Sequence, residues 1–341
     1  MQFKRTEELK KGMRLARPIY NKNGVLLYER DSKLTEQGIA SIRNFGMIGI
    51  YILEPAEPVP PMTEDDIKFE RFQTINVFAI QDEIERILAT GKSSRLQVII
   101  ANISKSYGHP GKKIHFIQSL RNREDYVYRH ALNVAILCAV LGDRMRLKAD
   151  AQQEVLMPAL LPVLRELEKF EKASFSNPNV SRYCQQADRI IESEKIGRLD
   201  PSIRWMKGAQ VLAVARVFDD MTAMSLEREP ESEVAAIRHL LEIKRVYFPE
   251  VVQALMDSIV ILDTGVCVEL STGEKALVLA ENPQNIFRPV VLCFRDNSIL
   301  DLGSWAARNV EILDIMKSMD IRHVMDPDML KKYNGKKVEV L

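Results

Sequence analysis

The sequence YVYRHALNVAILCAVL, residues Tyr126–Leu141, carries the strongest structural signal in the chain. Its apolar residues occupy nearly every position around a helix, a pattern typical of a helix that is buried on all sides. The longest apolar part, Ala131–Leu141, contains Asn133 and is far shorter than the roughly 20 residues that cross a bilayer. We therefore expect a central core helix and no membrane insertion.

Helical periodicity extends on both sides of this segment, over residues 63–257. Thr63 with Asp66 is a capping-box start, and apolar residues then recur at helical spacing up to Gly91. The other predicted helices cover Ser94–Tyr107, Ile114–Arg123, Ala149–Lys172, Val180–Ser193, Gly208–Arg228, Glu231–Ile243 and Pro249–Asp257. The mixed-charge residues Arg121, Arg123, Glu124 and Asp125 are expected in a solvated loop before the central helix.

Shorter, alternating patterns flank this helical region. Residues 1–55 predict a small α+β domain, with strands at 13–20, 25–28 and 48–53 and a helix at 35–44, and residues 56–62 form a proline-rich linker. Residues 258–303 predict a small antiparallel β module, and residues 304–341 a helix over Trp305–Met319 followed by a polar tail. The predicted fold class is mainly α, a helical bundle with a small β-containing unit at each end.

Composition narrows the function classes. The 341 residues include 48 Lys and Arg against 47 Asp and Glu, a net charge of +1, and no local segregation of charge is evident in the sequence. This balance argues against binding a nucleic-acid polymer or a membrane surface. The four cysteines are isolated from one another, which favours buried, reduced thiols. Since the N-terminus lacks a secretory signal pattern, we expect a cytoplasmic protein.

Several segments resemble the HD-GYP family, bacterial phosphohydrolases that cleave the second messenger cyclic di-GMP. Residues 208–223, GAQVLAVARVFDDMTA, are similar to the family's A-R-I-L-A-V-A-D-V-F-D-A-M-T, and residues 248–252, FPEVV, are similar to its F-D-P-E-V-V. Residues 9–53 and 258–302 resemble accessory modules of clostridial-type members, whereas residues 165–205 match nothing in the family. The resemblance implies an HD-like helical bundle whose family activity depends on metal ions held by His and Asp.

The resemblance also implies that these metal ligands are lost. His130 matches the first His ligand, but Pro162 and Val163 stand where the His-Asp dipeptide should be. Arg216 replaces the closing Asp with a permanent cation. No His is followed by His, Asp or Glu, and the Gly-Tyr-Pro motif is absent. We therefore predict no catalytic residues, no metal and no cofactor, and expect Pro158 and Pro162 to kink or end their helix.

Three functions remain open. The first is a catalytically inactive regulatory or scaffold protein in bacterial signalling, which binds an unknown signalling protein or itself as a dimer through the helix over Thr63–Gly91. The second is a sensor of cyclic di-GMP or another phosphate ester, with Arg216 and His130 as ligand-binding residues. In the alternative structural role, Arg216 pairs with Asp219, Asp220 or Glu166. The third is a metal-dependent phosphodiesterase that uses unrecognised ligands, of which the candidates are Asp188, Asp200, Asp219 and Asp220.

Overall fold

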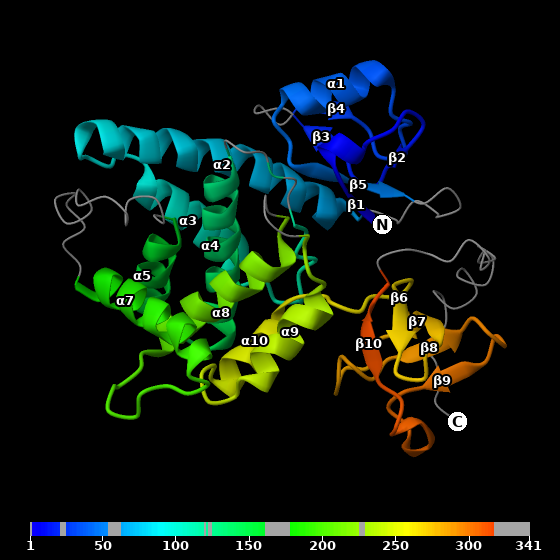
Figure 1. Ribbon diagram of the computed structural model, residues 1–341. Coiled ribbons are helices and arrows are strands. Elements are labelled where there is room, and N and C mark those ends of the chain that lie inside the picture. Colours follow the sequence, from blue (N-terminus) through cyan, green and yellow to red (C-terminus); the bar gives the residue numbers. More distant parts are fainter. Residues whose placement is uncertain are drawn as a thin grey trace.

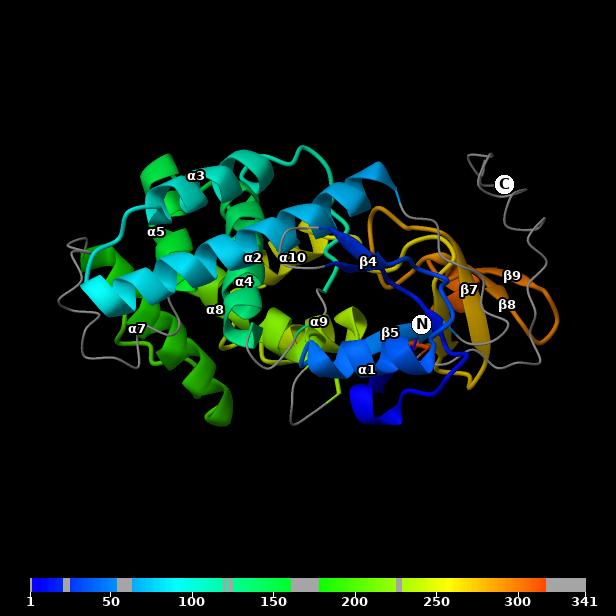
Figure 2. The same cartoon turned by 90° about the horizontal axis from the view of Figure 1, so that it is seen from above.

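The computed structural model describes residues 2–20, 25–53, 63–118, 121, 125–160, 178–224 and 229–316. Within them the chain is mainly α, with a small antiparallel sheet near each end of the described sequence, so the predicted fold class is confirmed. Both small β-containing units lie at the same end of the helical domain, and helix α7 lies at the opposite end (Figures 1 and 2).

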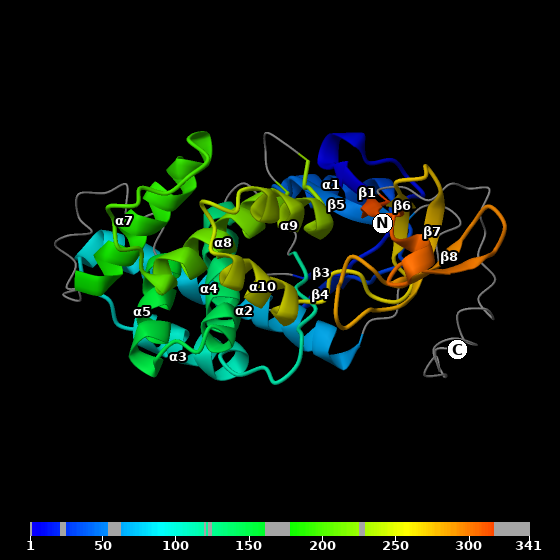
Figure 3. The same ribbon diagram turned by 90° about the horizontal axis from the view of Figure 1, so that it is seen from below.

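The helical domain is assembled around the predicted central helix. Its helices are α2 (Glu64–Thr90), α3 (Leu96–Tyr107), α4 (Tyr126–Arg144), α5 (Ala149–Leu160), α7 (Pro178–Glu192), α8 (Lys207–Thr222), α9 (Glu233–Glu242) and α10 (Pro249–Ser258). Every residue of α4 from Ala131 to Gly142 is buried, because α2, α3, α5, α8 and α10 all pack against it. Figure 3 shows α8 and α10 beside α4 from below.

Helix α2 has the start and the end that its sequence predicts. The Thr63 hydroxyl accepts from the Asp66 amide, the Asp66 carboxylate accepts from the Thr63 amide, and Gly91 ends the helix with a φ of 69°. Its buried apolar residues, which include Ile80 and Ile84, belong to the main core of the same chain. The dimer interface expected on this helix stays a prediction, but its apolar face is already used within the chain.

The N-terminal unit has its own small core. Its elements are β1 (Gln2–Arg5), the 3-10 helix η1 (Thr6–Glu8), β2 (Arg14–Leu15), β3 (Ile19–Tyr20), β4 (Leu26–Tyr28), α1 (Glu36–Asn44) and β5 (Gly49–Leu53). Strands β1, β5 and β2 form an antiparallel sheet with β5 in the middle, and β3 pairs with β4. Leu15, Ile42 and Ile50 are fully buried between this sheet and α1.

The C-terminal unit is a sheet in the order β10-β6-β7-β8-β9. Its strands are β6 (Cys267–Leu270), β7 (Lys275–Ala280), β8 (Val290–Cys293), β9 (Ile299–Asp301) and β10 (Ile312–Ile315). The helix predicted over Trp305–Met319 is wrong in the described residues, where a short 3-10 helix (η4, Trp305–Ala307) precedes strand β10. The edge of β6 provides unpaired backbone groups that β10 satisfies, with Ile312 opposite Leu270. The sheet therefore extends past residue 303, the boundary that the sequence predicted.

Four other predictions can be compared with the described residues. The helix expected over Ile114–Arg123 is wrong in the described residues, since Ile114 forms a parallel bridge with Ile259 and the chain then runs without helical structure to Gln118. Helix α5 continues through Pro158 to Leu160, and Pro162 lies outside the described residues.

All four cysteines are described and none is in a disulfide, but only Cys138 and Cys293 are buried. Among the described helices, none combines the length and apolarity needed to cross a bilayer.

Candidate functional site

Asp219 is the centre of a buried polar cluster near the C-terminal end of α8. Its side chain has no exposed surface. Oδ1 accepts hydrogen bonds from Gln118 Nε2 at 3.0 Å and Asn133 Nδ2 at 2.9 Å. Oδ2 accepts from Arg121 Nη2 at 2.6 Å and His130 Nδ1 at 2.7 Å. Four side chains from outside α8 therefore converge on one carboxylate.

A second layer of hydrogen bonds holds these donors in place. Gln118 Nε2 also donates to Thr222 Oγ1 at 2.7 Å, and its Oε1 accepts from Asn133 Nδ2 at 3.0 Å. Gln73 Nε2 on α2 donates to Asn133 Oδ1 at 2.9 Å and to the carbonyl of Ile117 at 3.1 Å. The Asp219 network thus links α2, α4, α8 and the segment around residues 117–121; its members are Gln73, Gln118, Arg121, His130, Asn133, Asp219 and Thr222.

The electrostatics of the network favour a charged Asp219. Burial alone would raise the pKa of its carboxyl, but the Arg121 guanidinium and the hydrogen bond from His130 outweigh burial and hold the pKa well below its usual range. Arg121 is itself fully buried, and its guanidinium lies 4.9 Å from the ring centre of Tyr126. Asp219 and Arg121 form a buried ion pair that needs both charges.

The predicted site residues fall into different surroundings. His130 joins the Asp219 network and is 15% exposed, with its Nδ1 3.4 Å from Asp220 Oδ1. Arg216 instead donates to Asp188 Oδ1 at 2.8 Å, a partner other than the three that the structural role named. Pro162, Val163 and Glu166 lie outside the described residues.

The candidate aspartates also separate. Asp219 and Asp220 lie beside His130, whereas Asp188 is engaged by Arg216 on α8. Asp200 accepts from the amide and the hydroxyl of Ser202, at 2.8 and 2.7 Å, and so stabilises a turn. The four aspartates therefore do not assemble into one site.

One triad of these residues has a spacing that would suit a metal ion. One ligand atom each from His130, Asp219 and Asp220 lies within 4.8 Å of the other two. Both Asp219 oxygens, however, already accept two hydrogen bonds, and the Arg121 guanidinium is 2.6 Å from Oδ2. A metal cation there would displace these donors and meet a fixed positive charge, so the residues present do not fit a metal.

Sequence reasoning missed most of the network. Arg121 and Asp125, expected in a solvated loop, are 0% and 2% exposed, so that prediction is wrong for both; Arg123 and Glu124 lie outside the described residues. The signal that could have revealed a network is Asn133, a polar residue in an otherwise apolar buried stretch and one helical turn after His130. A buried amide requires hydrogen-bond partners, and these had to come from elsewhere in the chain.

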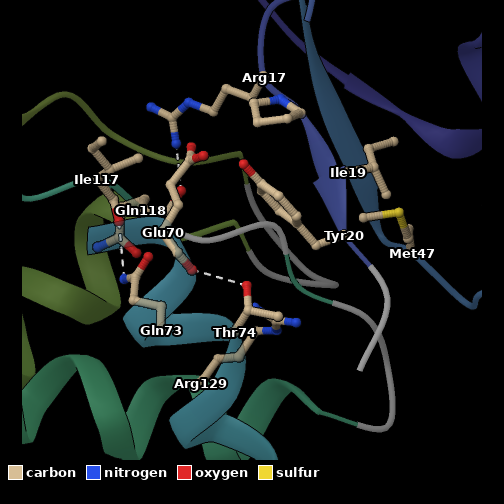
Figure 4. Close-up of a pocket in the computed structure, with 11 residues that line it drawn as sticks. Arg17, Ile19, Tyr20, Met47, Glu70, Gln73, Thr74, Ile117, Gln118 and Arg129 are labelled. Atoms are coloured by element: carbon tan, nitrogen blue, oxygen red, sulfur yellow. Dashed lines mark hydrogen bonds between the residues drawn. The ribbon is translucent and has the colours of Figure 1, made fainter. Parts of the chain in front are cut away.

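The network continues to the junction with the N-terminal unit, where a cavity of about 50 Å³ has room for a few water molecules (Figure 4). Gln73 and Gln118 line this cavity together with Arg17, Tyr20 and Glu70. Arg17 donates to the Gln118 carbonyl, and the Arg121 carbonyl accepts from the Ile48 amide at 3.0 Å. Burial raises the pKa of Glu70 to about 7. The junction is therefore polar and directly connected to the Asp219 network.

Comparisons of the chain with protein-family models, curated proteins and solved structures gave no match. The HD-GYP resemblance therefore stays a prediction from the segments quoted above. The mainly α fold and the geometry of the Asp219 network do not depend on it.

Proposed function

We propose that this chain is a catalytically inactive, HD-GYP-like regulatory or scaffold protein of bacterial signalling that works in the cytoplasm. One observation carries the catalytic part of the proposal, the fully buried ion pair between Arg121 and Asp219. Asp219 is the central member of the triad with His130 and Asp220, and the Arg121 guanidinium already binds the carboxylate that a metal cation would need. Metal-dependent phosphodiester cleavage needs ions that activate water and neutralise the attacked phosphate. A guanidinium bound to the central carboxylate opposes the binding of such ions, because it is a fixed positive charge beside the atom that would have to hold them.

The regulatory part of the proposal is supported by the position of the network. Backbone carbonyls of Gln118 and Arg121 accept hydrogen bonds from Arg17 and from the Ile48 amide of the N-terminal unit. The side chains of the same two residues bind Asp219. A shift of the N-terminal unit would therefore act directly on the packing of α4 against α8, which suits a module that relays a binding event.

The sensor hypothesis loses support at the pocket where the sequence placed it. Arg216 was expected to clamp a phosphate beside His130, but its guanidinium is 2.8 Å from the Asp188 carboxylate. A phosphate would have to compete with a charged partner that is already in place.

The catalytic test is hydrolysis of cyclic di-GMP by the full chain with Mn²⁺, Fe²⁺ or Mg²⁺, beside an active HD-GYP protein in the same buffer. We expect no turnover. Cleavage that stops with a chelator and in Asp220→Asn, which alters the same triad but keeps the buried ion pair, and that persists in Arg43→Gln, would overturn the proposal.

The scaffold test is association. Analytical ultracentrifugation of the full chain should show a dimer, or a pull-down should recover a signalling protein that binds the purified chain directly. A strictly monomeric chain for which no direct partner is recovered would count against the scaffold role.

A further inference from the structure

A groove between α7 and the start of α8, the helix that carries Asp219 near its other end, has the chemistry of an anion site. Its volume is about 680 Å³, within the range of small-molecule sites of about 300–1,000 Å³. Helix α7 lies at the end of the helical domain away from both β-containing units (Figure 1). The lining residues come from α7 and from the segment that leads into α8; they are Arg182, Gln185, Gln186, Arg189, Ile203, Arg204, Trp205, Met206 and Lys207.

The sequence of α7 explains why one side of the groove is polar. Its buried residues are Val180, Tyr183, Ala187 and Ile190, which pack into the core. The groove residues of α7 are spaced i, i+3, i+4 and i+7 and therefore share one face of the helix; they are Arg182, Gln185, Gln186 and Arg189. An amphipathic helix thus presents two guanidinium groups and two amides to the groove.

Specific hydrogen bonds fix the other wall. Gln186 Nε2 donates to the carbonyl of Arg204 at 3.2 Å, and its Oε1 accepts from the amide of Met206 at 2.7 Å. Trp205 Nε1 donates to the carbonyl of Asp200 at 3.0 Å, which anchors the indole ring. The segment before α8 is therefore held against α7 as a formed wall.

The charge of the groove is unbalanced. Four of its nine lining residues are cations and none is Asp or Glu. All four cations are exposed, and among the described parts of the chain none of them makes an ion pair; they are Arg182, Arg189, Arg204 and Lys207. Like charges gathered in one groove repel, and a bound polyanion would relieve that repulsion.

Helix α8 adds to the same field. It begins at Lys207, so the positive end of its dipole lies at the groove. Its N-cap residue, Met206, supplies no side-chain cap for the first backbone amides. The four side chains remain the main source of positive potential. Together they match a ligand with at least two negative charges close to each other.

We propose that this groove binds a nucleotide with at least two phosphate groups. The guanidinium and ammonium groups would hold the phosphates, because these donors form charge-assisted hydrogen bonds with phosphate oxygens. The anchored Trp205 ring offers a flat surface for a base, and Gln185 offers an exposed amide for its polar edge. The nucleotide would be the effector of the regulatory role proposed above, and the inference rests on that role. Nucleotide binding at this groove can be measured separately from hydrolysis.

The test is calorimetric titration of the full chain with ATP, GTP and cyclic di-GMP, each beside inorganic tripolyphosphate and a single-stranded oligonucleotide. We expect one of the three nucleotides to bind saturably, with one site per chain and at least tenfold tighter than tripolyphosphate. Arg182→Gln/Arg189→Gln should weaken binding at least tenfold. Trp205→Leu should reduce the affinity to that for tripolyphosphate, since it removes the aromatic surface for the base and leaves the four cations of the groove in place.

The matched control is Arg43→Gln/Lys105→Gln, which removes two exposed positive charges from other helices and should leave binding unchanged. Hydrogen exchange of the unmodified chain should show protection of α7 by the nucleotide, a readout that does not depend on the folding of a variant. Equal affinity for tripolyphosphate, binding of the oligonucleotide alone, an equal loss in the control, or no heat and no protection would each overturn the nucleotide site. None of these results would contradict the proposal that the chain lacks phosphodiesterase activity, which the hydrolysis assay tests.

Discussion

The substitution Asp219→Asn tests the buried network most directly. It keeps the size of the side chain but replaces one acceptor oxygen with an amide group that donates. If the amide nitrogen takes the Oδ1 position, it faces the donating amides of Gln118 and Asn133; if it takes the Oδ2 position, it faces the Arg121 guanidinium. In both orientations Arg121 keeps a buried charge without its counterion. Removing one partner of a buried ion pair costs about 3–5 kcal/mol, and we expect a loss of unfolding free energy in this range.

The assay is urea unfolding followed by circular dichroism at pH 7.5. The matched control is Asp220→Asn, because this neighbouring side chain is 48% exposed and should cost less than about 1 kcal/mol. The native pKa of Asp219 is lowered, so its stabilisation is complete above the unfolded pKa of about 4 and is lost as the pH falls further. The difference between the unmodified chain and Asp219→Asn should therefore shrink below pH 4. A cost under 1 kcal/mol at pH 7.5 would refute the structural role of the network.

Three further predictions concern stability. Burial raises the native pKa of Glu70 to about 7, above its unfolded value of about 4.3. Stability that is present at low pH is therefore lost as the pH rises toward 7. Glu70→Gln should remove most of this loss, which urea unfolding at pH 5 and pH 8 measures. Thr63→Ala should cost about 1 kcal/mol by removing the α2 cap, whereas Thr63→Ser should retain most of it, as thermal melts will show. A Cβ at Gly208 would lie 2.6 Å from both Tyr183 and Val155, so Gly208→Ala should cost about 1–3 kcal/mol, and an unchanged melting temperature would contradict this packing.

Local sequence patterns were sufficient to predict the elements whose structure depends on residues close together in the sequence. The apolar surroundings of Asn133 predicted a central helix, and Thr63, Asp66 and Gly91 predicted both ends of α2. These features depend on helical periodicity and on hydrogen bonds between residues three or four positions apart. The fold class followed from them, because most of the chain has this periodicity.

The buried network and the last strand depend on contacts between residues that are distant in the sequence. Arg121 is buried because Asp219 lies 98 positions away in sequence and 2.6 Å away in space, and no local pattern records that pairing. Residues 312–315 form a strand because the β6 edge, more than 40 positions earlier, supplies the backbone partners.

Charge is the clearest case of this division. The sequence established a net charge of +1, and no local segregation of charge was evident in it. Folding places the basic face of α7, with Arg182 and Arg189, against the segment that carries Arg204 and Lys207. Helical spacing predicts which residues of α7 share a face. Only tertiary packing decides what that face meets, because the second wall is held by contacts such as the one from the Met206 amide to Gln186, 20 positions away.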